Sequence, residues 1–502
     1  MEALVLAAAI GTVRSIGADA YATATVVPAS IYALIGGGLF TSFLVPQIVR
    51  ASRGTDQGQA YVNKLLSLAA VGFAVVAVLA TALSPLLMFV YGQRGPGWVL
   101  ACGLALWSFP QVFFLGLSAV LGEVLNARRV FGWSTWAPVA NNVVGIAGLA
   151  LFVVLFGAVG HRDAAGYSTL AVVVLGASGL AGVAVQVLVL MLGWRVSGPR
   201  FRPDFRWRSV GLAATGRTGG WTIAMLASTQ LVGLLQAAVA NQAAGVGPST
   251  GALGYAWLIF MLPHSLVTVS LLTVFYPRLS SAAASEDAAA FRSILSRTIR
   301  TVLPLIALAN VALLVAAEPI ARLLTHGPRD AQALAVIIDV YLLGLVPFTI
   351  LAIVQRCFYA LGDTRTPFLY TLVQVAIVGA GFAVTALLPL IAAATTAAGI
   401  VQASLAWRLL RKRMGRVLLG LRASTRSIGT AATGALLVGG LALVAANGTL
   451  GTDAILAAWP PALAAAAVLA VLTTAAYLTG LKLTGSVALQ EASTRLRSVA
   501  TR

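Results

Sequence analysis

The sequence contains very little charge. Only 9% of its 502 residues are Asp, Glu, Lys or Arg, whereas 59% are hydrophobic and the mean hydropathy is +0.94. Soluble domains carry about 25% charged residues, so this composition excludes a soluble fold and indicates a polytopic membrane protein. A net charge of +19 would suggest nucleic-acid binding in a soluble protein. In a membrane protein it is typical of basic loops that set the topology, and we expect no nucleic-acid partner.

Residues that build metal and redox sites are scarce. The chain has two cysteines, Cys102 and Cys357, in separate apolar runs, and three scattered histidines, His161, His264 and His326. This pattern argues against a disulfide framework and a thiolate metal site. The sequence has no GxxxxGK[ST] motif, so it carries no ATPase of the P-loop type. We therefore expect no cofactor, no metal and no enzymatic activity.

What the sequence does have is long apolar segments, read against a bilayer span of about 20 residues. Fourteen segments lie roughly at 2–17, 20–49, 62–91, 97–126, 133–157, 168–194, 212–240, 250–276, 299–325, 331–361, 366–388, 390–410, 427–447 and 455–480. The connections after even-numbered segments, with Arg217 and the C-terminal tail, hold 28 of the 33 basic residues. This asymmetry predicts an all-α membrane protein with both termini in the cytoplasm.

Three local patterns recur along the chain in the same order. Separated by 231, 234 and 233 residues, they pair Pro46 with Pro277, Pro85 with Pro319 and Ala127 with Ala360. Such spacing indicates a duplicated six-helix unit whose copies share one orientation. We predict two six-helix lobes, 1–197 and 198–413, followed by a C-terminal helix pair and tail at 414–502. Two lobes around a central cavity favour a transporter that works by alternating access.

Polar side chains inside the predicted spans are candidates for the substrate cavity, because an ionisable group in hydrocarbon is costly. These candidates are Asp19, Ser30, Tyr32, Thr41, Ser42, Arg217, Gln230, Trp257, His264, Asp339 and Arg356. Most of the ionisable ones lie near an interface, where snorkelling explains them equally well. Asp339, the deepest acid, either lines the cavity or makes a structural hydrogen bond. His264 is either a satisfied core residue or a ligand.

Several predicted spans contain residues that would break a soluble helix. Consecutive glycines permit close backbone approach and bending, and prolines leave carbonyl groups unpaired. Unpaired carbonyls are tolerated only against protein or a watery cavity. We interpret the following residues as hinges or scaffold: Pro28, Gly36, Gly37, Gly38, Pro46, Pro263 and Pro277.

Four stretches of the chain are specific in their order and spacing. They are GGGLFTSFLVPQIVRA, GEVLNARRVFGWSTWAPVANN, YAWLIFMLPHSLVTVSLLTVFYPRLS and RCFYALGDTRTPF. Together they resemble the MurJ (MviN) family, the lipid II flippases of the MATE-like MOP exporter superfamily, in its actinobacterial form. The resemblance implies fourteen helices, in two lobes plus a final pair that holds the lipid tail. It also implies transport of an undecaprenyl-pyrophosphate-linked peptidoglycan precursor to the outer leaflet of the plasma membrane. The implied partners are the lipid-linked glycan, membrane lipids and cell-wall synthesis proteins.

The sequence departs from the family pattern at charged positions of the second and eighth spans. Where relatives carry arginine and glutamate, this chain has Tyr32 or Ala33, Gly37, Leu258 and Met261. The cationic cavity that the family uses for pyrophosphate is therefore largely missing here.

Other charged positions of the family are kept or displaced. Asp19 matches an acidic family position. Glu2 matches the acid of the first span, so the arginine position before it falls at Met1 or earlier. Either translation starts upstream or the first helix is shorter than in relatives. Arg217 and Arg356 are the nearest substitutes for the missing cavity arginines.

Three functions follow as hypotheses. The motifs favour a lipid II flippase, and the missing arginines favour an exporter of another lipid-linked saccharide or a small molecule. A non-transporting scaffold of cell-wall synthesis is the third. Complementation of a strain that lacks its flippase separates the first two, and transport by the purified protein in liposomes excludes the third.

Overall fold

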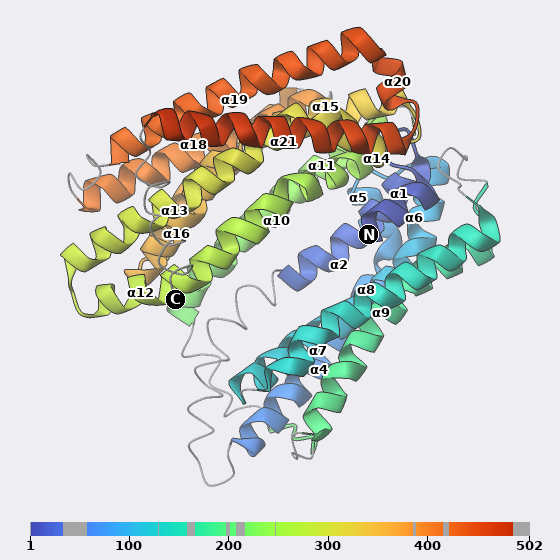
Figure 1. The fold of residues 1–502 in the computed structure, drawn as a ribbon. Helices are drawn as coiled ribbons and strands as arrows, with labels where there is room; N and C mark the ends of the chain where they lie inside the picture. Colours follow the sequence, from blue (N-terminus) through green and yellow to red (C-terminus); the bar gives the residue numbers. More distant parts are fainter. Residues whose placement is uncertain are drawn as a thin grey trace. The chain divides into compact units, whose positions relative to one another are not determined.

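The computed structural model of the chain is built from helices (Figure 1). It describes residues 2–33, 58–128, 130–157, 166–196, 201–206, 216–245, 247–384, 388–414 and 421–484, and these contain no strand. Contacts divide the chain into two compact units, Met1–Gly251 and Ala252–Arg502. Each unit is described by itself.

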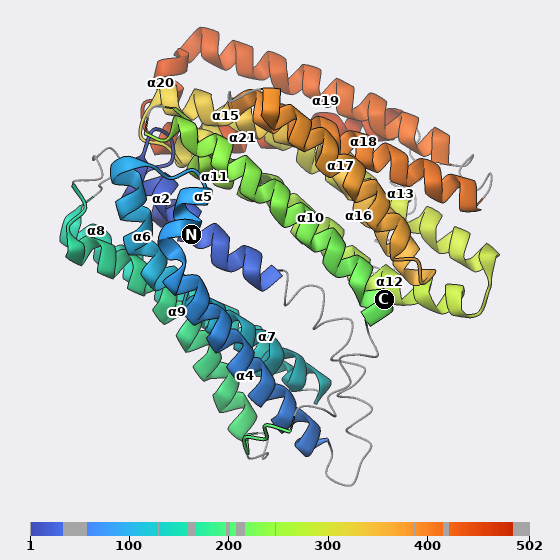
Figure 2. The same cartoon turned by 180° about the vertical axis from the view of Figure 1, so that it is seen from behind.

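The first unit consists of apolar helices. They are α1 (Glu2–Ile10), α2 (Ile16–Tyr32), α4 (Gln59–Ala82), α5 (Ser84–Val90), α6 (Gly95–Ser108), α7 (Gln111–Ala127), α8 (Phe131–Phe156), α9 (Thr169–Val196), α10 (Gly216–Ala240) and the 3-10 turn η5 (Asn241–Ala243). Serine, proline and glycine residues lie at several of the helix ends. Ser15 caps α2, since its Oγ accepts the backbone N–H of Ala18 at 3.2 Å. Helices α8 and α9 lie side by side in both views (Figures 1 and 2).

The second unit begins within α11 and ends with a long helix pair. Its helices are α11 (Thr250–Pro263), the π-helix η6 (His264–Val269), α12 (Ser270–Ala284), α13 (Ala288–Val315), α14 (Ala317–Leu323), α15 (Pro328–Leu342), α16 (Leu345–Ala360), α17 (Arg365–Val384), α18 (Leu388–Met414), α19 (Leu421–Leu450), α20 (Thr452–Leu456) and α21 (Trp459–Leu483). Helices α19 and α21 pack along each other, at the red end of the colour bar (Figure 2). They form the C-terminal pair that the sequence predicts.

The same order of long, short and broken helices occurs in both units. Equivalent helix ends recur 233 residues apart, at Ser84 and Ala317, Gly95 and Pro328, and Ala127 and Ala360. Pro85 and Pro319 lie in the first turn of the short helices α5 and α14. Proline is tolerated in a first turn but not in a helix interior, so each long helix ends just before it. This doubled pattern agrees with the predicted repeat.

Eleven helices of the described residues are long and apolar enough to cross a membrane. The three other predicted spans contain α1, α2 and α17, with 9, 17 and 20 described helical residues. The predicted number of fourteen is therefore consistent with the structure.

The contact-based division differs from the predicted lobe boundaries at 197/198 and 413/414. Helix α10, which the sequence assigns to the second lobe, belongs to the first unit. The reason is that Asn241 and Ser249, which follow α10, form hydrogen bonds with residues near the start of the chain. The lobe boundaries stay a prediction.

Candidate functional site

Asp19 lies at the centre of a buried polar network in the first unit. It occupies the first turn of α2 and is 1% exposed. Its Oδ1 accepts hydrogen bonds from the hydroxyl of Ser249 and from the backbone N–H of Gly251, the latter at 3.1 Å. Its backbone carbonyl accepts the hydroxyl of Thr23 at 2.7 Å. A buried carboxyl group needs such partners, so these donors fix the position of Asp19.

Gln93 and Asn241 extend the network by donating their side-chain amides. Gln93 Nε2 donates to Thr23 Oγ1 at 2.9 Å and to the carbonyl of Asp19 at 3.3 Å. Asn241 Nδ2 donates to the same hydroxyl oxygen at 3.0 Å and to the carbonyl of Tyr91 at 2.7 Å. We use the name outer polar network for six residues: Asp19, Thr23, Gln93, Asn241, Ser249 and Gly251. The network joins three connections that the sequence predicts on the outer face.

Two oxygen atoms of the outer polar network have no hydrogen-bond partner among the described residues. They are Asp19 Oδ2 and Asn241 Oδ1. An unpaired buried acceptor is costly where the dielectric constant is low. The network can therefore still accept a donor, although Asp19 Oδ1 is already fully engaged.

Gln230 connects α10 to the C-terminal end of α2, whereas Asp19 lies at the N-terminal end of α2. Its Nε2 donates to the backbone carbonyl of Ser30 at 3.0 Å. Pro28 lies buried inside α2 and has no N–H, so the carbonyl of Ala24 loses its helical donor. Tyr32 ends the helix and is half-buried. The structure thus brings the candidates Ser30 and Gln230 together, through a carbonyl rather than through the serine hydroxyl.

Trp257 belongs to an aromatic group in the second unit. Its ring stacks on Phe260 with centroids 4.9 Å apart, and it meets Tyr341 and Phe348 edge-on at 5.9 and 6.1 Å. The ring of His264 lies 4.6 Å from that of Phe348. We use the name aromatic group for these five residues, which come from α11, η6, α15 and α16. Of these, sequence reasoning had proposed only Trp257 and His264.

His264 opens a π-helical segment directly after Pro263. It is 5% exposed, and its Nδ1 has no partner among the described residues. Four residues later the hydroxyl of Thr268 is 3.2 Å from that of Thr349, and both side chains are buried. Single π-helical turns occur frequently at functional sites and mark a helix that departs from regular pairing. Pro277 lies inside α12, and the roles of Pro263 and Pro277 as hinge or scaffold residues stay predictions.

Two charged candidates remain in the second unit. Asp339 in α15 is half-buried, and its Oδ1 has no partner among the described residues. Arg356 in α16 is exposed, with its guanidinium 5.1 Å above the ring of Tyr276. A cation over an aromatic face is stabilised by the ring quadrupole, so Tyr276 orients this arginine.

Several sequence candidates lie outside the part of the chain that the structure describes. They are Thr41, Ser42, Gly36, Gly37, Gly38 and Pro46. Arg217 lies in the first turn of α10, where only the backbone is described. Their predicted roles stay predictions.

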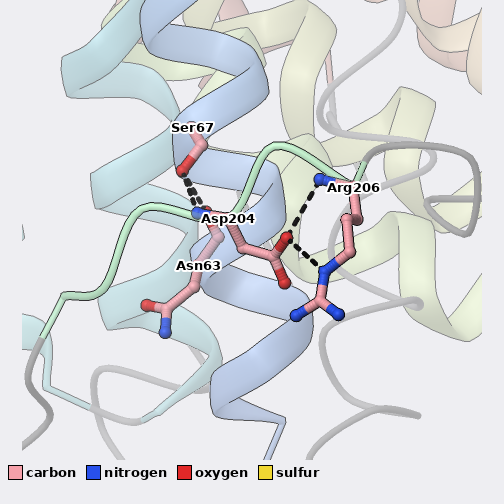
Figure 3. Close-up of polar contacts among 4 residues, drawn as sticks. All are labelled: Asn63, Ser67, Asp204 and Arg206. Carbon is pink, nitrogen blue, oxygen red and sulfur yellow. Dashed lines mark hydrogen bonds and ion pairs between the residues drawn. The ribbon is translucent and has the colours of Figure 1, made fainter.

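Residues 201–206 dock on α4 in the first unit (Figure 3). The backbone N–H of Asp204 donates to Ser67 Oγ at 3.0 Å, and the Ser67 hydroxyl donates to the carbonyl of Asn63 at 2.8 Å. The carboxylate of Asp204 faces Arg206, whose backbone N–H donates to it at 2.9 Å and whose Nε donates at 3.3 Å. These hydrogen bonds, with the nearby positive charges of Arg206 and Lys64, hold the pKa of Asp204 below its usual range.

Arg128 caps the end of α7 in the same part of the first unit. Its Nη2 donates to Gln59 Oε1 at 2.9 Å, and its guanidinium lies 4.9 Å from the ring centre of Trp194. Partial burial lowers the pKa of Arg128, since the charged form loses hydration. The sequence identified Arg128 as a topology signal but gave no reason to expect these partners.

The outer polar network and the aromatic group contain most of the residues that sequence reasoning missed. Gln93, Asn241 and Ser249 lie in short connections, where apolar-run analysis assigns no role. Phe348 and Tyr341 look like ordinary apolar positions of a long span. Only their three-dimensional neighbours distinguish them.

The described residues contain no group of three or more His, Cys, Asp or Glu side chains that could hold a metal ion. Cys102 and Cys357 are both free thiols, one half-buried and one buried. The two described sites therefore consist of hydrogen-bonding groups and aromatic rings, which suit binding and conformational change.

Comparison with known proteins agrees with this architecture. The family model described as lipid II flippase MurJ matches residues 6–469. A probable lipid II flippase MurJ of Rhizobium meliloti (strain 1021) is 28% identical over 398 residues, covering 74% of this chain and 69% of the relative. The lipid II flippase MurJ of Burkholderia cenocepacia is 26% identical over 360 residues, covering 70% of this chain and 68% of the relative.

Solved structures show the same fold. A lipid II flippase MurJ in an inward closed conformation matches with a TM-score of 0.71 and 19% identity, covering 95% of this chain and 96% of that chain. An inward-facing MATE family transporter of the MOP superfamily matches with a TM-score of 0.62 and 16% identity, covering 83% and 99%. With a family model that spans nearly the whole sequence, the chain belongs to the lipid II flippase MurJ family.

Proposed function

We propose that this chain moves lipid II from the inner to the outer leaflet of the bacterial plasma membrane. The observation that carries the proposal is the match of the lipid II flippase family model to residues 6–469. The doubled helix pattern supports it, because two equivalent lobes are the architecture that alternating access requires. The membrane-spanning helices fit a multi-pass transporter. The family match makes a lipid-linked glycan the proposed substrate.

In the proposed mechanism the lobes 1–197 and 198–413 rock against each other, and the pair at 414–502 holds the lipid tail. The headgroup crosses between the lobes while the tail stays in lipid. Hydrogen bonds of the outer polar network hold the connections around Asp19 together in one state. Release requires the Ser249 hydroxyl and the Gly251 N–H to leave Asp19 Oδ1.

We further propose that both termini face the cytoplasm, where 28 of 33 basic residues would then lie. The cavity candidates keep their proposed role where the structure leaves them exposed or half-buried, as for Ser30, Tyr32, Trp257 and Arg356. Asp19 and His264 are buried and would act through the conformation of α2 and η6. Cell-wall synthesis proteins are proposed partners at the membrane surface.

Reconstitution tests this proposal. Purified protein in liposomes should bring labelled lipid II within reach of an enzyme confined to the opposite side, and protein-free liposomes should not. In cells, depletion should reduce the lipid II accessible at the outer leaflet. Equal accessibility with and without the protein would refute the flippase function.

A second candidate function is transport of a different lipid-linked saccharide. The observation that favours it is the absence of Asp, Glu, Lys and Arg between residues 250 and 277, where relatives carry charge. Leu258, at one of those positions, is 42% exposed. If this chain supports growth of a strain that lacks its own lipid II flippase, the chain transports lipid II. That result would exclude the hypothesis that it transports only other lipid-linked saccharides.

A further inference from the structure

Trp257 presents a fixed aromatic surface in the second unit. Its neighbours Phe260 and Tyr341 are each 4% exposed, whereas Trp257 itself is 41% exposed. The ring is stacked on Phe260 at an interplanar angle of 23° and meets Tyr341 and Phe348 at 78° and 75°. Contacts from α11, α15 and α16 therefore fix its orientation in advance. Such preorganisation lowers the entropic cost of binding a ligand.

The same continuous helical segment carries exposed hydroxyl groups. Ser265 in η6 and Ser270 and Thr273 in α12 are exposed. Ser265 donates to the carbonyl of Met261 at 2.5 Å, and Thr273 donates to the carbonyl of Ser270 at 2.6 Å. A hydroxyl oxygen has two lone pairs, so each of these groups can still accept a hydrogen bond from a ligand.

The electrostatics of this segment favour a neutral ligand. Residues 250–277 contain no Asp, Glu, Lys or Arg, and His264 is buried. A pyrophosphate would find no cation here, and an ammonium or carboxylate would find no counter-charge. The same segment exposes Leu258, Leu262 and Leu266, which an acyl chain can contact, but an acyl chain has no donor for the hydroxyl acceptors. A saccharide matches all three properties, because it is neutral, rich in hydroxyl donors and has apolar C–H faces.

We propose that Trp257 is the surface on which a sugar ring of the transported lipid-linked saccharide stacks, with Ser265 accepting a sugar hydroxyl. The inference rests on the proposed function and adds the recognition of its carbohydrate part. The negative face of the indole attracts the weakly positive C–H groups of a pyranose face. Ser265 follows Trp257 by eight residues, about 12 Å along the helix axis. Ser270 and Thr273 are further exposed hydroxyl residues of the same helical segment.

Binding measurements with two lipids test the proposal. One lipid is polyprenyl pyrophosphate carrying the disaccharide, and the other is the same polyprenyl pyrophosphate without sugar. Trp257→Leu should weaken binding of the saccharide-bearing lipid by roughly five- to tenfold, the range of an aromatic contact, and leave the bare lipid unchanged. Trp257→Phe should keep most of the affinity, because a ring remains. Trp136→Leu is the matched control, since Trp136 in α8 is 66% exposed and lies in the first unit.

Each outcome decides a separate point. Equal loss of affinity for both lipids would show that Trp257 contacts the tail or the fold, and unchanged affinity for both would show no contact at all. Either result overturns the sugar surface. If the Trp257→Leu variant does not fold, Trp257→Phe and Trp257→His are compared instead, at equal thermal stability. Affinity for the saccharide-bearing lipid should be higher in Trp257→Phe than in Trp257→His, and equal affinities would overturn the sugar surface. If the unaltered protein binds and moves no lipid-linked saccharide, the proposed function itself fails.

Discussion

Asp19 and Ser249, which lie 230 residues apart in the sequence, share a buried hydrogen bond. Asp19 belongs to the start of the first unit and Ser249 to its end. The bond therefore closes the unit upon itself, and Asn241 and Gln93 reinforce it through the hydroxyl of Thr23. This relationship ties the segment that follows α10 to the start of the chain and accounts for the burial of Asp19.

Replacing Asp19 by Leu should destabilise the protein. The change leaves the Ser249 hydroxyl and the Gly251 N–H without their acceptor in a buried site. We expect a loss of about 2–4 kcal/mol, the size of a broken buried network. Thermal unfolding of the purified protein in one detergent measures the effect. Ser249→Ala is the matched control, which removes one donor only and should cost about 1 kcal/mol. Equal losses in both variants would contradict the central place of Asp19.

The helical fold and its doubled pattern were accessible from the sequence. Apolar length alone predicts spans, and basic residues predict their orientation, because both follow from the cost of transfer into lipid. The breaks before Pro85 and Pro319 were not predicted, because the expected spans 62–91 and 299–325 run through both prolines. Which helices pack against one another could not be predicted from the sequence.

The candidate sites were only partly predictable. Asp19 stood out as an acid next to an apolar run, yet its donors Ser249 and Gly251 come from far along the chain. The pairing of Gln230 with Ser30 uses a backbone carbonyl, which no side-chain pattern reveals. The fixed orientation of Trp257 depends on Tyr341 and Phe348 in other helices. Long-range packing decides such contacts, and a single sequence does not encode it in any local signal.

Gly92 and Gly95 should respond differently to alanine. Both have a positive φ, +84° and +55°, so each alanine is strained. At Gly92 an added Cβ would also lie 2.5 Å from the carbonyl oxygen of Ala238 in α10, whereas at Gly95 it meets nothing within 4 Å. We expect Gly95→Ala to cost about 1 kcal/mol and Gly92→Ala at least 3 kcal/mol. Similar thermal stabilities of the two variants would contradict this prediction and would mean that the backbone of α10 near Ala238 can shift to accommodate the methyl group without loss of stability.

Asp363 should contribute stability that depends on pH. Burial alone would raise the pKa of Asp363, but hydrogen bonds from the backbone N–H and hydroxyl of Thr366 and from Arg413 Nη1, at 2.7 Å, outweigh it and lower the pKa. A lowered folded pKa gives stability that is complete above the unfolded value of about 3.9 and is lost as pH falls through the folded value. The Arg413 side chain is 47% exposed, so we expect about 1 kcal/mol.

The measurement compares the unaltered protein with Asp363→Asn, which retains a helix-capping side chain. Their difference in thermal stability should be constant from neutral pH to about pH 5 and should shrink below it. Arg413→Gln should reduce this pH-dependent difference without abolishing it, since the ion pair is lost but the hydrogen bonds from Thr366 remain. A gap that widens in acid would contradict the lowered pKa.

Arg322 should hold the C-terminal helix pair at its connection. Its Nε donates to the carbonyl of Leu456 at 2.5 Å and its Nη2 to that of Ala457 at 3.0 Å, while Nη1 donates to the carbonyl of Thr325. These carbonyls end α20 and precede α21, where a cation also complements the helix dipole. Arg322→Gln removes most of these bonds, and charged hydrogen bonds contribute about 1.5–3 kcal/mol.

Hydrogen–deuterium exchange over residues 452–458 measures this loss. The exchange rate should rise at least about tenfold in Arg322→Gln, because every 1.4 kcal/mol changes the equilibrium of local opening tenfold. Arg329→Gln removes the same charge from the start of α15 and should leave this exchange unchanged. Faster exchange in both variants would point to a general effect of charge on the outer connections. Faster exchange in Arg322→Gln alone would mean that one guanidinium fastens the pair to α14, so that the pair moves with the second unit.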